Sequence, residues 1–181
     1  MKIRHRLPRW ARRFAGDTKG VSAVEFALVL PLMLTLYMGG AELAQAISAS
    51  RKVTLVSRTV ADLAAQFATI SDATMTGILD SSAAVIAPFN PSTLRVTVSQ
   101  VTIAADGTAT VVWSDTRGGT VRSGGTTLPA VLNVPNTSVI WAEAEYGHTP
   151  AVGYVLTGGE IALRDQMYMR PRMANSVTRT P

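Results

Sequence analysis

Gly20-Val21-Ser22-Ala23-Val24-Glu25-Phe26-Ala27-Leu28-Val29-Leu30-Pro31 opens an almost wholly apolar run that continues to Ala41. Glu25 is the only charged residue between positions 21 and 41. About 20 such residues suffice to cross a bilayer as an α-helix, because each residue adds about 1.5 Å to the helix length. The run 21–41 therefore predicts a transmembrane helix around which the rest of the chain is arranged.

The residues before this run, 1–20, form a basic leader. They hold seven of the 17 Lys and Arg residues but only one of the 12 acidic residues, so the leader accounts for the whole net charge of +5. Cations keep the amino end of a membrane helix in the cytoplasm, and we therefore expect the chain after the helix to be periplasmic. The charge indicates topology and not nucleic-acid binding.

Glu25 requires an explanation, because a carboxylate inside a membrane segment is costly and by default marks a functional site with a partner. Two interpretations remain open. Glu25 lies only five residues into the run, so its side chain can extend to the membrane interface. Alternatively, a peptidase cuts between Gly20 and Val21 and frees an α-amine one helical turn from Glu25. The carboxylate then pairs with the amine of its own chain or of a neighbouring subunit, which sets the register between chains.

The basic leader, Gly20 at the cut, Glu25 as the fifth residue after it and then Phe26 resemble a class III signal peptide of type IV pilin-like proteins. A longer motif in the same region is more specific to one family, because an acid, an aromatic residue and a Leu-Pro pair rarely occur together in a membrane segment. It resembles the TadE/TadG family of pseudopilins, from the tight-adherence (Flp, type IVc) pilus machinery. The resemblance is most informative over residues 16–67, and the motif is Ala23-Val24-Glu25-Phe26-Ala27-Leu28-Val29-Leu30-Pro31.

This resemblance implies a minor pilin or pseudopilin, anchored in the bacterial inner membrane by one helix, that acts in pilus assembly. It implies prepilin peptidase, other pilin-like subunits and the pilus assembly platform as partners, with Glu25 and Phe26 in subunit pairing. It implies a protein that is not an enzyme and has no cofactor, metal, nucleic-acid partner or small-molecule substrate. The alternative is a signal-anchored periplasmic binding or structural domain whose leader is never cut.

Apolar residues recur at helical spacing after the membrane segment, so we expect the helix to continue through residues 42–70. The whole helix would then be one rod of roughly 70 Å, kinked at Pro31. The apolar stripe packs either on the protein's own domain or on a partner helix. Its members are Leu43, Ile47, Val53, Val56, Val60, Leu63 and Phe67.

Residues 71–171 predict an α+β domain with a pilin-like plan: a second short helix and a four-stranded antiparallel sheet. Ser71-Asp72 is an N-cap for a helix near Ala73–Ala87, and Asp106-Gly107 is a hairpin turn. A slip in the alternation at Ser99-Gln100 suggests a bulge. We expect strands at 94–103, 108–114, 138–148 and 160–170. Loops are expected at 115–136 and 153–159, and the second of them resembles the loops with which pilin-like domains touch neighbouring subunits. We expect the tail at 172–181 to be mobile.

Few residues outside the leader could carry chemistry. The chain has no Cys, which excludes disulfides and thiolate sites. Glu143, Glu145, His148 and Asp165 are the only acid–histidine group, and alternation along a strand places His148 on the opposite face from the two glutamates. One His and scattered acids lack metal-ligand spacing, so we interpret the glutamates as a solvated strand edge. Strand-face or core positions are expected for Trp113, Trp141 and Tyr146.

Overall fold

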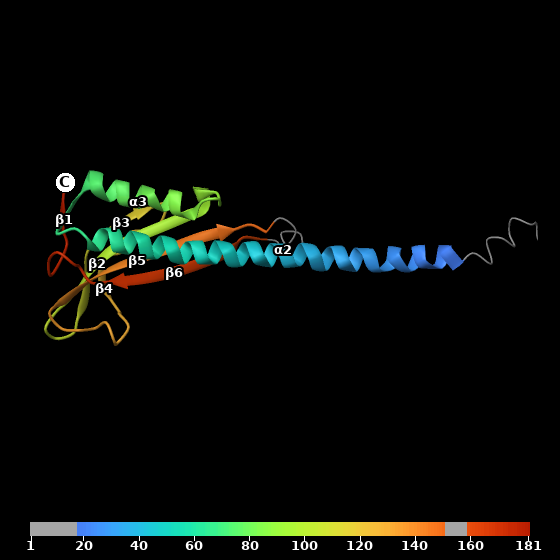
Figure 1. Cartoon of the computed structure of the whole chain (residues 1–181). Helices are drawn as coiled ribbons and strands as arrows, with labels where there is room; N and C mark the ends of the chain where they lie inside the picture. The colour runs from blue at the N-terminus through green and yellow to red at the C-terminus, as the bar shows by residue number, and fades with distance from the viewer. Residues whose placement is uncertain (1–17, 151–158) are drawn as a thin grey trace, which may run out of the picture.

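A single long helix dominates the computed structural model, which describes residues 18–150 and 159–181. Helix α2 spans Thr18–Ala65, 48 residues, and its amino-terminal half projects far beyond the folded domain (Figure 1). At about 1.5 Å per residue it is roughly 72 Å long, close to the predicted length. It ends at Ala65 and not at residue 70 as expected, because Thr69–Ser71 form the short strand β1. The helix continues without interruption through Pro31 and through Gly39-Gly40.

The carboxyl-terminal half of α2 packs on the domain because one of its faces is apolar and built from small residues. Buried positions recur at helical spacing, and four of them are alanines that let the helix approach the sheet closely. The buried residues of this half are Ala49, Val53, Val56, Ser57, Val60, Ala61, Ala64 and Ala65.

The second helix, α3, spans Asp72–Ile86 and packs beside α2, which confirms the predicted short helix. Ser71 is its N-cap: the Ser71 side chain accepts a hydrogen bond of 3.3 Å from the backbone N–H of Thr74. Such a cap satisfies one of the amide groups that the first turn leaves unpaired. The buried face consists of Met75, Ile78, Leu79, Ser82 and Ile86.

The main sheet is antiparallel and has five strands in the order β4-β3-β2-β5-β6. The expectation of four strands is therefore wrong by one. The additional strand β4 lies in the segment 115–136 that the sequence predicts to be a loop, where it pairs with β3. A 3-10 turn, η1 (Pro91–Thr93), precedes the sheet. The strands are β2 (Leu94–Ile103), β3 (Ala109–Arg117), β4 (Gly124–Thr126), β5 (Thr137–His148) and β6 (Ile161–Met169).

The slip in alternation at Ser99-Gln100 is not a bulge in β2. The β2–β5 register is continuous from Leu94↔Tyr146 to Ile103↔Thr137. The irregularity lies opposite, where Gln100 pairs with Trp113 and Val101 pairs with Val111, so that Val112 of β3 is the extra residue. The alternation slips in the sequence because the sheet is apolar on one face near Val98 and on the other face near Val101.

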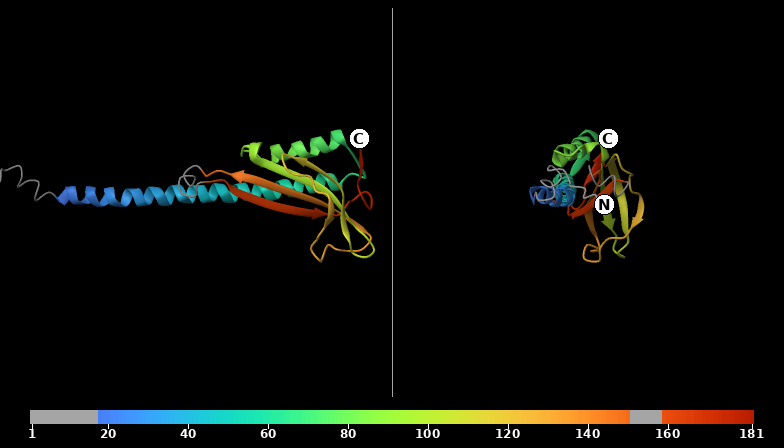
Figure 2. Two further views of the ribbon diagram at one scale, coloured as in Figure 1. Left: turned by 180° about the vertical axis from the view of Figure 1, so that it is seen from behind. Right: turned by 90° about the vertical axis from the view of Figure 1, so that its right-hand side faces the viewer.

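Each face of the sheet has its own apolar cluster. On the helix face, α2 packs on β5 and β6, while α3 packs on α2 and β3 (Figure 2). This face holds the larger cluster, which includes Val96, Val98, Ile140 and Ala142 together with the buried residues of both helices. The other side, here called the loop face, holds a smaller cluster. Its members are Val101, Ile103, Ala109, Leu128, Val139 and Trp141.

The carboxyl-terminal segment is part of the fold, so the expectation of a mobile tail at 172–181 is wrong. Strand β7 (Thr178–Thr180) pairs in parallel with β1 (Thr69–Ser71), which lies between the two helices in sequence. Val177, just before β7, is buried in the larger cluster. This two-stranded sheet lies at the end of the domain farthest from the projecting half of α2 (Figure 1).

Candidate functional site

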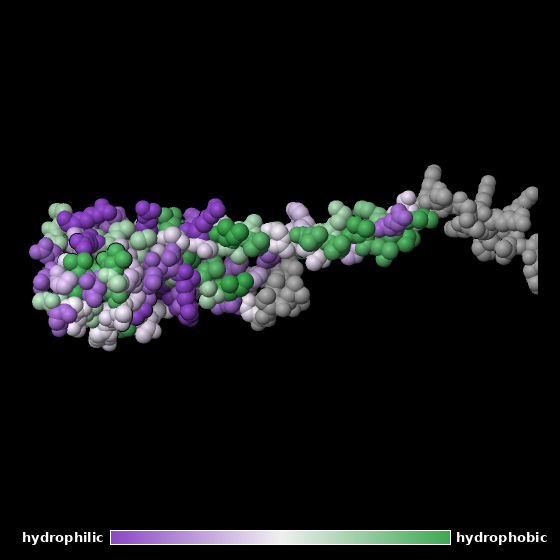
Figure 3. All heavy atoms as spheres, turned by 90° about the horizontal axis from the view of Figure 1, so that it is seen from below, coloured by the Kyte–Doolittle hydropathy of each residue, from purple (hydrophilic) through white to green (hydrophobic). Residues whose placement is uncertain are grey.

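The amino-terminal half of α2 is apolar and unpacked. No residue from Gly20 to Ser48 is buried, and Figure 3 shows apolar side chains covering the visible side of this part of the helix. The helix has an 18-residue window with a mean hydropathy of 1.9 and no buried residue, and it is long enough to cross a membrane. A helix that is apolar on every side needs lipid or partner helices around it.

Glu25 lies near the start of this apolar segment, and the next charged residue is Glu42. The charge-free interval between them is roughly 25 Å long, somewhat less than the hydrocarbon thickness of about 30 Å. Within residues 18–150 and 159–181, no hydrogen bond or ion pair joins the Glu25 side chain to another residue. Glu25 and the neighbouring Phe26 are both exposed.

Glu25 begins a continuous stripe along one side of the helix. Residues that follow one another at spacings of three and four lie on the same side of an α-helix. The stripe continues past Ala41 to Leu43 and Ile47, which are 62% and 46% exposed. We call the following residues the exposed stripe: Glu25, Val29, Leu32, Leu36, Gly40, Leu43 and Ile47.

The structure divides the apolar periodicity of residues 42–70 between its two interpretations. Val53, Val56 and Val60 are buried in the core of the protein's own domain, whereas Leu43 and Ile47 are exposed, at 62% and 46%. The helix therefore has an inward-facing carboxyl-terminal half and an outward-facing amino-terminal half, and both are apolar.

Part of this helix matches a known protein family. Residues 20–62 match the family model described as TadE-like protein. This part of the chain is TadE-like. The match begins at Gly20 and extends into the part of α2 that packs on the sheet, which confirms the resemblance found in the sequence. No curated protein and no solved structure matches the chain.

In the folded domain, the acidic residues and the histidine singled out in the sequence do not form one cluster. Glu143 and Glu145 lie on the loop face of β5, while His148 lies on the helix face, as alternation predicts. The interpretation as a solvated edge is wrong, because β5 is an inner strand between β2 and β6. The expected separation of His148 from the glutamates is confirmed, and no three acidic or histidine residues of the described ranges are placed to hold a metal ion.

Arginines pair with both glutamates. Arg122 binds the carboxylate of Glu143 through two nitrogens. The Glu145 carboxylate lies 3.0 Å from Arg164 and 4.0 Å from Arg95. Both carboxylates are therefore engaged in ion pairs within the domain. Of the two other members of the group, Asp165 accepts a hydrogen bond from the backbone N–H of Gln166. His148 is buried edge-on against Phe89, and its Nε2 has no hydrogen-bond partner among the described residues.

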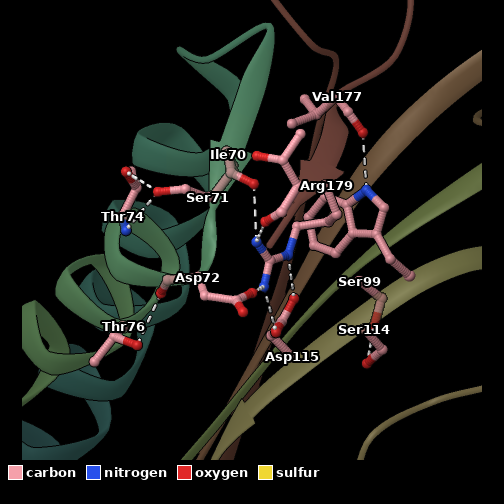
Figure 4. Close-up of polar contacts among 12 residues, drawn as sticks. Ile70, Ser71, Asp72, Thr74, Thr76, Ser99, Ser114, Asp115, Val177 and Arg179 are labelled. Carbon is pink, nitrogen blue, oxygen red and sulfur yellow. Dashed lines mark hydrogen bonds and ion pairs between the residues drawn. The ribbon is translucent and has the colours of Figure 1, made fainter.

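A polar cluster that the sequence does not predict fastens the carboxyl terminus (Figure 4). The guanidinium of Arg179 donates two hydrogen bonds to Asp115, at 2.9 and 3.0 Å, and one of 2.7 Å to Asp72. It also donates to the carbonyl of Ile70 at 2.8 Å. The hydrogen bonds to Asp115 raise the pKa of Arg179 above its ordinary value. This cluster, here called the clasp, joins β7, β1, α3 and β3.

Two further contacts extend the clasp to the centre of the sheet. The indole N–H of Trp113 donates a hydrogen bond of 2.8 Å to the carbonyl of Val177. The backbone N–H of Val177 donates to the side-chain oxygen of Gln100, which is buried in β2. Val177 is the only large apolar residue within 174–181. Its presence is the one feature of the sequence that indicates burial of this segment.

The predicted contact loop at 153–159 lies outside the described residues except for Gly159. The strands that it joins are described. In Figure 1, β5 ends and β6 begins at the end of the domain that faces the projecting half of α2.

Proposed function

We propose that this protein is a membrane-anchored minor pilin or pseudopilin that acts in assembly of a tight-adherence pilus. Two observations support the proposal: the TadE-like match over residues 20–62, and a 48-residue helix that joins an apolar, unpacked half to a folded domain without a break. The protein is not an enzyme in this proposal. The basic leader lies in the cytoplasm, residues 21–41 cross the inner membrane, and the α+β domain is periplasmic.

The exposed stripe makes the subunit contact. Helices associate in a membrane by van der Waals packing and by polar contacts, because lipid is as apolar as the side chains themselves. Prepilin peptidase cuts between Gly20 and Val21, and the new α-amine pairs with Glu25 of the same chain or of a neighbour. The pairing makes one register of the helices preferable to the others.

The observation that favours a subunit contact over a simple membrane anchor is the exposure of Leu43 and Ile47. They lie beyond residues 21–41, on the same side of the helix as Glu25, and are 62% and 46% exposed. A helix that only anchors a domain needs no apolar stripe that continues past the charged residue Glu42 toward the domain. Contact with a second helix explains why the stripe continues there.

The test is piliation of cells that carry variants at Glu25. Glu25→Ala should insert into the membrane as well as the wild type, or better, because it removes a charge from an apolar segment. It should nevertheless impair pilus formation. Glu25→Gln should behave in the same way, whereas Glu25→Asp, which keeps the charge, should retain part of the activity.

The second candidate function is an uncut, signal-anchored periplasmic domain, which the continuity of α2 with the domain also permits. It predicts that all three Glu25 variants support normal piliation and that the leader stays on the mature protein. Normal piliation by Glu25→Ala, at wild-type protein levels in the membrane, would reject the pairing and favour this alternative.

A further inference from the structure

The loop face of the sheet contains a hollow of about 930 Å³, away from the TadE-like helix. Its floor is formed by β2, β5 and β6, and one wall by the segment 119–126, which bends back over the sheet. The hollow is of the size that small ligands or short peptide segments occupy. Its polar lining includes Arg95, Thr97, Arg122, Glu143, Glu145 and Arg164.

A built cation site lies at one side of this hollow and is filled by Arg122. The guanidinium carbon of Arg122 lies 3.9 Å from the centre of the Trp141 ring. Two guanidinium nitrogens donate hydrogen bonds to the two carboxylate oxygens of Glu143. An aromatic face combined with a two-pronged carboxylate contact is the geometry that recognises arginine in preference to lysine.

The backbone of the site and its aromatic ring are held independently of Arg122. The indole N–H of Trp141 donates to the side-chain oxygen of Gln166 at 3.2 Å, and the Tyr168 ring stacks on Trp141 with centres 5.4 Å apart. Trp141 and Glu143 belong to the inner strand β5, which is paired on both sides. The Trp141 ring and the position of Glu143 on its strand therefore do not depend on the occupant.

The occupant, in contrast, is carried by an exposed loop. Gly118-Gly119 and Gly124-Gly125 flank the residues that carry Arg122, and Gly118 and Gly124 have the positive φ values of 69° and 79°. Besides the contacts of the Arg122 guanidinium and the pairing of β4 with β3, three hydrogen bonds among the described residues hold this loop on the sheet. They are the hydrogen bonds from the Arg122 N–H to Ser114, from Thr97 to the Thr120 carbonyl and from the Gly119 N–H to Thr116.

We infer that Trp141 and Glu143 form an arginine-binding site, that Arg122 is its internal occupant, and that an arginine side chain of a partner polypeptide displaces Arg122. Because the arginine Arg122 fits the site, the partner side chain that replaces it is also an arginine. The hollow beside the site accommodates the backbone of the incoming segment. The inference concerns the folded domain, and it rests on neither the TadE-like helix nor the proposed role in the pilus.

The test uses the full chain in detergent micelles and a peptide with blocked ends, Gly-Arg-Gly. The chain has three tryptophans, Trp10, Trp113 and Trp141, so ¹⁵N labelling of tryptophan gives few indole signals to follow. In Arg122→Ala, the peptide should shift the Trp141 signal at concentrations at least tenfold lower than in the wild type. The wild type needs more peptide because its own Arg122 competes at a high effective concentration.

Three controls make the result specific. Trp113 lies on the helix face, where it donates to Val177, so its signal should not move and reports an intact fold. The blocked peptide Gly-Lys-Gly should bind more weakly, because lysine lacks the planar fork. Arg122→Ala/Glu143→Gln should lose the response. Arg122→Gln, which keeps a polar stem over Trp141, replaces Arg122→Ala if the alanine variant does not fold.

Either of two outcomes overturns the inference. In the first, the variant with an unchanged Trp113 signal shows no movement of Trp141 at tens of millimolar peptide. In the second, the wild type responds at the same peptide concentrations as the variant, which means that Arg122 does not compete for the site, or it does not respond at all, which means that Arg122 is not displaced. Arg122 is then a structural strap only.

Discussion

Replacing Arg179 with Ala removes the central cation of the clasp and should destabilise the folded domain. The Arg179 side chain is 17% exposed and Asp115 is 27% exposed, so the variant leaves a largely buried carboxylate without its partner. Asp72 is 71% exposed, and its contact with Arg179 contributes little, because water solvates an exposed carboxylate well. The cost therefore comes mainly from Asp115 and from the carbonyl of Ile70.

The size of the effect follows from these exposures. Breaking a fully buried ion pair by removing one partner costs about 3–5 kcal/mol, and a hydrogen bond to a charged group is worth about 1.5–3 kcal/mol. Because both partners here keep some contact with water, we expect about 3 kcal/mol. A domain of roughly 130 residues has an unfolding entropy of about 0.27 kcal/mol/K, so the melting temperature should fall by about 10 °C.

The assay is thermal unfolding of the full chain in detergent, followed by tryptophan fluorescence, since Trp113 contacts the clasp directly. Arg172→Ala is the matched control: Arg172 pairs with Asp62 on the surface, is 58% exposed, and should cost less than about 1 kcal/mol. Arg179→Lys should lie between the two, because it keeps the charge and loses the fork. A loss below 3 °C for Arg179→Ala, or equal losses for Arg179→Ala and Arg172→Ala, would refute the reasoning.

Three further predictions concern the helices. Ser71→Ala removes the N-cap of α3 and should cost about 1 kcal/mol, or about 4 °C in the same melting assay, whereas no change would mean that the cap is dispensable. Val53→Ala opens a cavity in the core and should cost about 2 kcal/mol of stability. Ile47→Ala, on the exposed part of the same helix, should melt like the wild type. Equal losses in the two variants would contradict the division of α2 into a packed and an exposed half. Leu43→Ala/Ile47→Ala should therefore keep its stability and lose piliation, and normal piliation by this double variant would count against the exposed stripe as a subunit contact.

The features that the sequence predicts well are those with strong local signals. The α2 helix is evident from a long apolar run followed by a stripe at helical spacing, and α3 is evident from Ser71 at its start and from its apolar face. The hairpin turn Asp106-Gly107 is also confirmed: the N–H of Gly107 bonds to the Ala104 carbonyl, and Gly107 has a positive φ of 86°. In each case the decisive residues are neighbours in sequence.

The strands that the sequence misses have no such signal. Gly124–Thr126 and Thr178–Thr180 are three residues long, and each is a strand only because a partner from elsewhere in the chain lies beside it. The same limit applies to the function of single residues. Glu143 was assigned to a solvated edge because strand order is not written in a strand's own residues, and Arg122 in a glycine-rich loop gives no sign that it reaches Trp141.

The apolar phase of β2 shows why even a correct local pattern can be misinterpreted. The slip near Ser99-Gln100 is real, but it marks the place where burial moves from the helix face to the loop face. A bulge and a change of buried face produce the same pattern in one strand. Only the partner strands distinguish them, and they place the extra residue, Val112, in β3.

The measurement that tests the account most directly is the amino terminus of the mature protein. Mass spectrometry of the protein purified from its native membranes gives this terminus without any variant. A chain that begins at Val21, with the α-amine one helical turn from Glu25, is the result that the pilin-like account predicts. A chain that keeps its whole basic leader from Met1 would contradict it, because no amine would then be available for Glu25 to bind.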